Sequence, residues 1–138
     1  MSDKFHHVRR FPTNDIVVWE LSGAPTLEEW TAYIDTVTTW LTGEESRGRR
    51  WGVIVDPSRL KNVTAPMRRA SGQWRAAHLP LIANTCICAS YVANSAVIRG
   101  AITAIFWFAQ PVIPVKVHGS QRESHEWLAE KMNELALT

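Results

Sequence analysis

The sequence predicts one α/β domain with a mixed, mostly parallel sheet of about five strands and about four helices. Its 138 residues, 46% hydrophobic and 20% charged, have the size and composition of a globular domain with one core. Apolar runs of strand length alternate with segments of helical periodicity, in the order β-β-α-β-α-β-α-β-α. This alternation predicts parallel pairing with an antiparallel first strand. No linker or repeat divides the chain, so residues 1–138 are expected to form a single domain.

In the first half, two segments rich in β-branched and aromatic residues flank a turn at Pro12-Thr13-Asn14, which predicts a hairpin. Thr26 and Glu29 make a capping box that begins a helix, and its apolar face continues until Gly43. The apolar run WGVIVD follows as a buried strand. The expected elements are strands at residues 5–10, 15–21 and 51–56 and a helix at 26–43.

In the second half, a helix with one apolar and one basic face is expected to end where Leu79-Pro80 interrupts it. The apolar run AITAIFWFA is far shorter than a membrane span and predicts a largely buried helix that Pro111 ends. A second capping box, SQRE, opens the last helix. The expected elements are strands at residues 86–93 and 112–118 and helices at 64–78, at 96–110 and from 120 onward.

Charge is unevenly distributed along the chain although its net value is only +2. Between Pro57 and Arg122 there are lysines and arginines but no Asp or Glu. Such a segment predicts a positive face that attracts an acidic partner, and Arg68, Arg69 and Arg75 are expected to form it on one helix. A solvated basic face without a partner is the alternative.

The carboxyl ends of the parallel strands are the second candidate site, because ligands in open α/β sheets gather there, beside helix N-termini that favour anions. The sequence brings a carboxylate, hydroxyls, an amide and a histidine to this edge, which is expected to bind a ligand or phosphate. Helix capping and turn formation are the alternative roles. The residues are Asp56, Ser58, Thr64, Asn94, Ser95, His118 and Ser120.

Several segments resemble a known family. The two opening strands, the VIVD strand with the helix after it, and the run CICASYVANSAVIRGAITAIFWF followed by IPVKVH are similar to the STAS fold. Anti-sigma-factor antagonists and STAS/SEC14-like bacterial proteins share this fold, and the likeness covers nearly the whole chain. It implies a signalling module that binds a protein partner. A homodimer is an option that belongs to the basic-face hypothesis and not to the resemblance.

The likeness does not extend to the phosphorylated motif of the antagonists. In those proteins the loop after the strand corresponding to VIVD carries Asp-Ser-Ser or Asp-Ser-Thr, with a phosphorylated hydroxyl. Here Thr64-Ala65-Pro66 occupies that place, and proline has no hydroxyl. The resemblance therefore implies partner binding without this phosphoswitch, although Thr64 and Ser58 remain as hydroxyls that can accept a phosphate.

Three hypotheses about function follow, in order of preference. The first is a non-catalytic interaction or regulatory module whose basic face binds an acidic protein. The second is a small-ligand or lipid-binding domain. An enzyme using Asp56, His78 or His118 as acid or base comes last, because the sequence has no acid pair, Gly-rich phosphate loop or nucleophile elbow. Nucleic-acid binding is disfavoured because no recognised binding motif is present.

The cysteines, tryptophans and N-terminus add smaller expectations. Cys86 and Cys88 are expected to be buried structural thiols, with neither a metal site nor a cofactor. No export signal is recognisable at the N-terminus, so a cytoplasmic location is expected. Trp19 and Trp51 are expected to form an aromatic surface on a sheet face without helices, which favours self-association or a protein partner.

Overall fold

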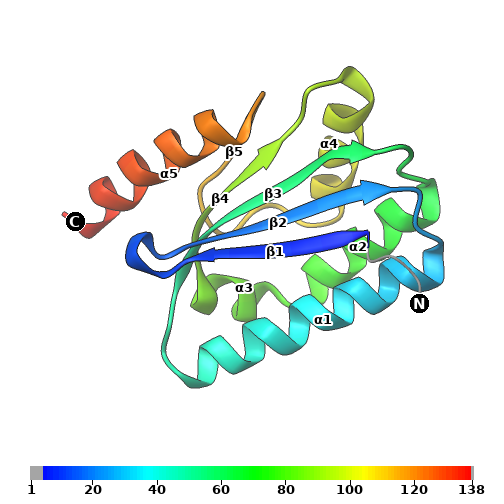
Figure 1. Ribbon diagram of the computed structural model, residues 1–138. Helices are drawn as coiled ribbons and strands as arrows, with labels where there is room; N and C mark the ends of the chain where they lie inside the picture. Colours follow the sequence, from blue (N-terminus) through cyan, green and yellow to red (C-terminus); the bar gives the residue numbers. More distant parts are fainter. Residues whose placement is uncertain (1–4, 138) are drawn as a thin grey trace.

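A five-stranded sheet with the order β1-β2-β3-β4-β5 is the frame of this computed structural model, which describes residues 5–137 (Figure 1). β1 runs antiparallel to β2, and every other neighbouring pair is parallel. The mixed, mostly parallel sheet predicted from the sequence is therefore confirmed. The strands are β1 (His6–Phe11), β2 (Ile16–Gly23), β3 (Trp51–Leu60), β4 (Cys86–Val92) and β5 (Val115–His118).

The described residues form five α-helices, one more than the sequence predicts. The additional helix, α3, begins where Leu79-Pro80 was expected only to interrupt α2. Pro80 lies in the first turn of α3, where a missing backbone N–H costs nothing. The helices are α1 (Leu27–Ser46), α2 (Ala65–Ala77), α3 (Leu79–Thr85), α4 (Ala96–Phe108) and α5 (Gln121–Ala136), and η1 (Pro12–Asn14) is a short 3-10 helix.

Two element boundaries differ from the expected ones for identifiable reasons. α1 continues past Gly43 because Glu44 is buried and accepts hydrogen bonds at 2.7 Å from both Trp51 Nε1 and Arg47 Nη1. β3 continues past Asp56 to Leu60, and it stays paired with β2 through an irregular register. Asp56 and Ser58 consequently lie within the strand instead of after it.

Helices cover both faces of the sheet (Figure 1). The larger hydrophobic layer joins Trp19 and Val53 of the sheet to buried residues of α1, α2, α3 and α4. The smaller layer forms around Leu128 of α5, which packs against Val18 and Ile54. β2 and β3 therefore alternate between two buried sides, which explains why both strands are continuous apolar runs.

Trp19 and Trp51 lie inside the larger layer, with only 4% and 2% of their surface exposed. Trp40 of α1 contacts both rings, with centroid distances of 5.9 and 5.6 Å. The expectation that these two tryptophans form an exposed aromatic surface is wrong, because α1 covers that part of the sheet.

α4 buries only one of its sides. Ile98 and Ile102 face the larger layer, whereas Trp107 and Phe108 are 81% and 47% exposed. The expectation of a largely buried helix is wrong, because α4 packs against α2 and the sheet on one side only. Within residues 5–137, no helix is long and apolar enough to cross a membrane.

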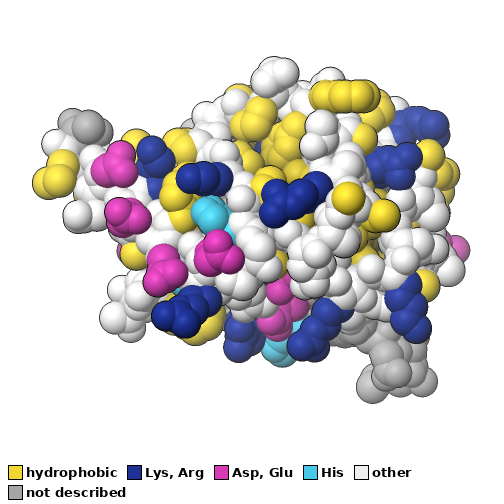
Figure 2. All heavy atoms as spheres, turned by 90° about the horizontal axis from the view of Figure 1, so that it is seen from above, with side chains coloured by type: hydrophobic (Ala, Val, Ile, Leu, Met, Phe, Trp, Pro, Cys, Tyr) yellow, Lys and Arg dark blue, Asp and Glu magenta, His cyan; other side chains and the backbone are white. Residues whose placement is uncertain are grey.

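Charged side chains are unevenly spread over the surface as well as along the sequence. α5 carries four glutamates. Figure 2 shows one face on which the Asp and Glu side chains gather mainly toward the side of α5, while hydrophobic side chains cluster elsewhere beside Lys and Arg. The chain thus presents apolar surface bordered by positive charge.

Gly72 marks a close approach of α2 to α4, since an added Cβ there would overlap the Phe108 side chain. We expect Gly72→Ala to lower the free energy of unfolding by about 1 to 3 kcal/mol, because α4 must move away. Gly43→Ala in α1 is the matched control, since a Cβ there meets nothing within 4 Å. It should stabilise the protein by about 0.5 to 1 kcal/mol through helix propensity. Urea unfolding of both variants measures the difference, and equal effects would show that α2 and α4 are not in close contact.

Candidate functional site

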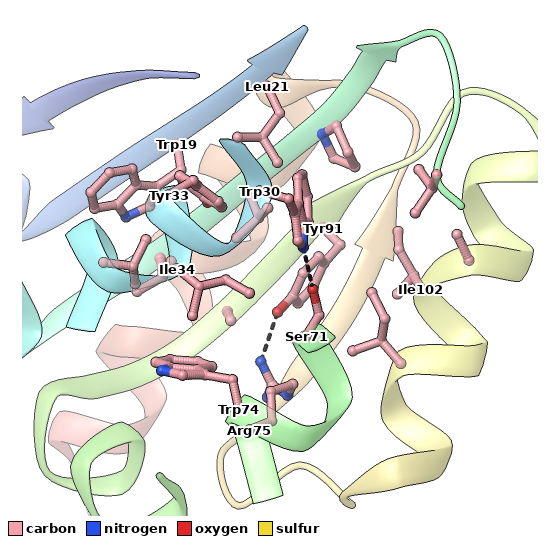
Figure 3. A pocket seen from close by; sticks show the side chains of 18 of the residues that line it. Trp19, Leu21, Trp30, Tyr33, Ile34, Ser71, Trp74, Arg75, Tyr91 and Ile102 are labelled. Carbon is pink, nitrogen blue, oxygen red and sulfur yellow. Dashed lines mark hydrogen bonds between the residues drawn. The ribbon is translucent and has the colours of Figure 1, made fainter. Parts of the chain in front are cut away.

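The larger layer contains a partly open cavity between the sheet, α1, α2 and α4 (Figure 3). Its volume is about 150 Å³. The cavity is partly open to solvent, and a volume of this size accommodates a molecule such as benzene. Almost all of its wall is apolar or aromatic, and the wall residues include Trp19, Trp30, Tyr33, Trp74, Tyr91 and Ile102.

Two hydrogen bonds between α1 and α2 fix the tryptophans of the cavity wall. Trp30 Nε1 of α1 donates to Ser71 Oγ of α2 at 2.9 Å, as Figure 3 shows. In the opposite sense, Trp74 Nε1 of α2 donates to Thr38 Oγ1 of α1 at 2.7 Å. Both indole N–H groups are thereby satisfied, so the two rings offer apolar surface to the cavity.

Among the described residues of the cavity wall, Arg75 is the one that carries a charge, and only 9% of it is exposed. Its Nη1 donates to Tyr91 Oη at 2.9 Å, and its guanidinium carbon lies 4.4 Å from the centre of the Phe106 ring. Its Nε is buried without a hydrogen-bond partner. Since a guanidinium cannot lose its charge in a protein, this cation is held in an apolar site.

The basic face predicted for α2 therefore needs correction. Arg75 does not share an exposed surface with Arg68 and Arg69, because Tyr91 and Phe106 cover it. Arg69 is exposed, and Arg68 is half-buried with its Nη1 donating to the carbonyl of Val63 at 2.6 Å. Arg68 and Arg69 instead line a shallow groove between α2 and α4, here called the α2–α4 groove, together with Ala65, Ala104, Trp107 and Phe108.

The residues predicted for the strand-end site do not converge on one point. Thr64, Ser95 and Ser120 are helix N-caps, and the side chain of each accepts a hydrogen bond from the backbone N–H three residues later, at 3.3, 3.2 and 3.2 Å. They begin α2, α4 and α5, and α5 lies on the opposite side of the sheet from the other two helices. Asn94 is exposed. The capping role thus accounts for three of the seven residues.

Asp56 forms a polar cluster with two residues that the sequence did not single out. Its Oδ1 accepts from the backbone N–H of Ser58 at 3.0 Å, and its Oδ2 accepts from Gln121 Nε2 at 2.7 Å. Gln121 Nε2 also donates to Glu20 Oε2 at 2.6 Å. This cluster ties the start of α5 to β2 and β3. Gln121 lies within the SQRE capping box, a pattern that predicts the helix start but not this contact.

His118 belongs to a chain of side-chain hydrogen bonds that joins β4, β5 and α5. Its Nδ1 lies 2.7 Å from Ser90 Oγ, which is 2.7 Å from Ser124 Oγ. Ser90 and Ser124 are completely buried, so neither hydroxyl can reach a substrate in this conformation. Burial, with a smaller contribution from Lys116, lowers the pKa of His118. These contacts give His118 a structural role.

The cysteines and His78, the remaining candidate residues, show no arrangement suited to catalysis or metal binding among the described residues. Cys86 and Cys88 are free and buried, as expected, and burial raises the pKa of Cys88 to about 11. Both thiols are therefore protonated at neutral pH and unreactive. His78 Nδ1 lies 2.8 Å from the carbonyl oxygen of Trp74, a contact within its own helical turn. Among residues 5–137, no three His, Cys, Asp or Glu side chains are grouped as metal ligands would be.

The lowered pKa values of two histidines predict how the stability of the protein depends on pH. Burial lowers the pKa of both His118 and His125, so the unfolded chain binds their protons more readily than the folded chain does. The free energy of unfolding should therefore be greatest above pH 6.5, the ordinary histidine pKa, and should fall between pH 6.5 and 5. Urea unfolding at pH 7.5 and 5.5 measures this fall. His118→Asn should make it smaller, and an unchanged fall would exclude His118 as its source.

Comparison with known proteins bears on the fold. No known family model matches the sequence, and no curated protein matches it. Among solved structures, an uncharacterized protein of the DUF3478 family from Shewanella loihica PV-4, described as having a SpoIIAA-like fold, is similar to this chain with a TM-score of 0.63. The similarity covers 93% of this chain and 98% of that one, at 14% sequence identity. The chain therefore has the SpoIIAA-like fold, the fold of the anti-sigma-factor antagonists with STAS domains that the sequence resembles.

Proposed function

We propose that this chain is a non-catalytic binding domain whose interior cavity takes a small, largely apolar ligand. The observation that carries the proposal is the cavity of about 150 Å³ with five aromatic rings in its wall. Protein interiors are packed closely enough that voids larger than a water molecule are few. A ligand that fills this cavity buries apolar surface of the wall and so stabilises the folded chain.

The packing of the wall supports a specific pocket over a random packing defect. The indoles of Trp30 and Trp74 are held by hydrogen bonds, so their rings have a fixed orientation before a ligand arrives. A preformed wall lowers the entropy lost on binding. The ligand is small, because a cavity of this volume has room for one aromatic ring and little more. This corresponds to the small-ligand alternative of the sequence analysis and not to a full-length lipid.

Filling the cavity by mutation tests the proposal. Benzene should raise the melting temperature of the wild-type protein, because it binds only the folded state. Ala101 of α4 lines the cavity, so Ala101→Leu should abolish this rise by occupying the space. Ala104→Leu on the same helix is the matched control, since Ala104 lines the α2–α4 groove instead. Thermal unfolding followed by circular dichroism, with and without benzene, gives the readout. Loss of the rise in both variants, or no rise in the wild type, would refute an accessible cavity.

A second candidate function is the binding of an acidic protein at the α2–α4 groove. Trp107 and Phe108 expose apolar surface there, directly beside Arg68 and Arg69. Exposed aromatic residues next to arginines are typical of protein interfaces, and the positive charge disfavours a second copy of the same surface as the partner. This proposal retains the interaction module of the sequence analysis, with a smaller basic surface. A cytoplasmic location belongs to the same proposal and agrees with the two free thiols.

Charge reversal distinguishes a local interface from general electrostatic attraction. An array of acidic peptides with and without aromatic residues should retain the wild-type protein, preferentially on the aromatic members. Arg69→Glu should reduce this retention about tenfold, because it places like charges together at the groove. Arg122→Glu changes the net charge equally but lies on α5, on the opposite side of the sheet, and it should have little effect. Equal losses in the two variants would contradict the groove as the interface.

A further inference from the structure

Arg75 has no oppositely charged partner among the residues that the structure describes. The ion pairs within residues 5–137 do not include it, and the other residues of the cavity wall are uncharged. Its contacts are one neutral hydroxyl, from Tyr91, and the face of one ring, from Phe106. Burying an ion without a partner is strongly unfavourable, and buried cations in proteins are ordinarily paired with a carboxylate or another anion. Within residues 5–137, Arg75 is therefore a buried cation without the anionic partner that such cations ordinarily have.

The free hydrogen-bonding groups at Arg75 have the geometry that suits a carboxylate. Tyr91 occupies Nη1, while Nε has no partner among residues 5–137 and is covered by neighbouring side chains, so a ligand reaches it only when these shift. The N–H groups of Nε and Nη2 point in the same direction along one edge of a guanidinium, and their spacing matches the two oxygens of a carboxylate. Figure 3 shows Arg75 and Tyr91 pointing toward each other from α2 and β4 at the cavity. The hydroxyl of Tyr91 accepts from Arg75 and keeps its own proton for a second acceptor.

We propose that the ligand of the cavity is a small monocarboxylate, whose carboxylate pairs with Arg75 and Tyr91 and whose ring or branched carbon skeleton fills the apolar space. This inference rests on the proposed ligand-binding function and specifies the ligand class. One positive charge matches one negative charge. A phosphate group would bring up to two negative charges, whereas Arg75 is the one cation among the described residues of the wall.

A pair of probes with the same shape and different charge tests the carboxylate. Benzoate and benzamide differ in charge but hardly in size, and isothermal titration calorimetry at pH 7.5 measures the affinity of each. The wild-type protein should bind benzoate at least about tenfold more tightly than benzamide, since a charge-assisted, two-point contact is available only to benzoate. Arg75→Met should remove this preference by weakening benzoate binding far more than benzamide binding. Tyr91→Phe should weaken benzoate binding several-fold with little effect on benzamide.

The stability of the ligand-free variants provides an independent measurement. If Arg75 is held for a ligand, Arg75→Met removes an unpaired buried charge, and its urea-unfolding midpoint should equal or exceed that of the wild type. If Arg75 has a purely structural role, the midpoint should fall. If Arg75→Met does not fold, Arg75 has a structural role and the inference is overturned. Arg75→Lys, which keeps the charge but lacks the two adjacent N–H groups, then checks this conclusion through its urea-unfolding midpoint.

The outcomes separate this inference from the proposed function on which it rests. If benzene raises the melting temperature but benzoate and benzamide bind equally, the cavity takes ligands and the carboxylate inference is wrong. If none of the three probes binds, the proposed function itself fails. If benzoate binds preferentially but Arg75→Met retains the preference, the anion binds elsewhere and the inference is again wrong. Only a preference lost in Arg75→Met and kept in Ala104→Leu supports it.

Discussion

The spacing between α1 and α2 is set by two hydrogen bonds of opposite direction, one from Trp30 to Ser71 and one from Trp74 to Thr38. Because each bond joins a large ring on one helix to a short hydroxyl side chain on the other, the helices are held together without their rings stacking on each other. The rings instead turn toward the sheet and line the cavity. The same spacing directs Arg75, one turn after Ser71, toward Tyr91 of β4. The cavity and its single charge therefore both depend on this pair of contacts.

The strand order explains why the site lies inside a layer and not at the strand ends. The four parallel strands, β2, β3, β4 and β5, lie side by side in the order in which they occur in the chain. Each connection therefore leads to the neighbouring strand on the same side of the preceding one. Right-handed crossovers then place all the connecting helices on one face. The order of the strands does not reverse along such a sheet. It therefore lacks the crevice that forms at the reversal point of doubly wound sheets, where these bind ligands. The capping residues Thr64 and Ser120 are separated for this reason, since α5 follows the last strand and lies on the other face.

Local chemistry made much of the fold predictable, while the site depends on contacts between distant segments. The caps at Thr26 and Ser120, the apolar strands and the helical periodicities are properties of short stretches, and each is found in the structure. Arg75 follows Arg68 by about two helical turns, so a helical pattern places both on one stripe. Of these two arginines, only Arg75 is covered by Tyr91 and Phe106, which are distant from it in the sequence. Likewise, the exposure of Trp107 depends on what packs beside α4 and not on its own apolar sequence.

The void in the larger layer also has a consequence for how long the chain persists in a cell. A protein whose interior is incompletely filled unfolds more often than a filled one, and proteases degrade the unfolded fraction. A change of 1 to 2 kcal/mol in folding free energy is enough to alter cellular abundance several-fold. If the cavity is occupied only when its ligand is plentiful, turnover of the chain becomes slower under those conditions. The amount of protein would then follow the supply of ligand, without any control of its synthesis.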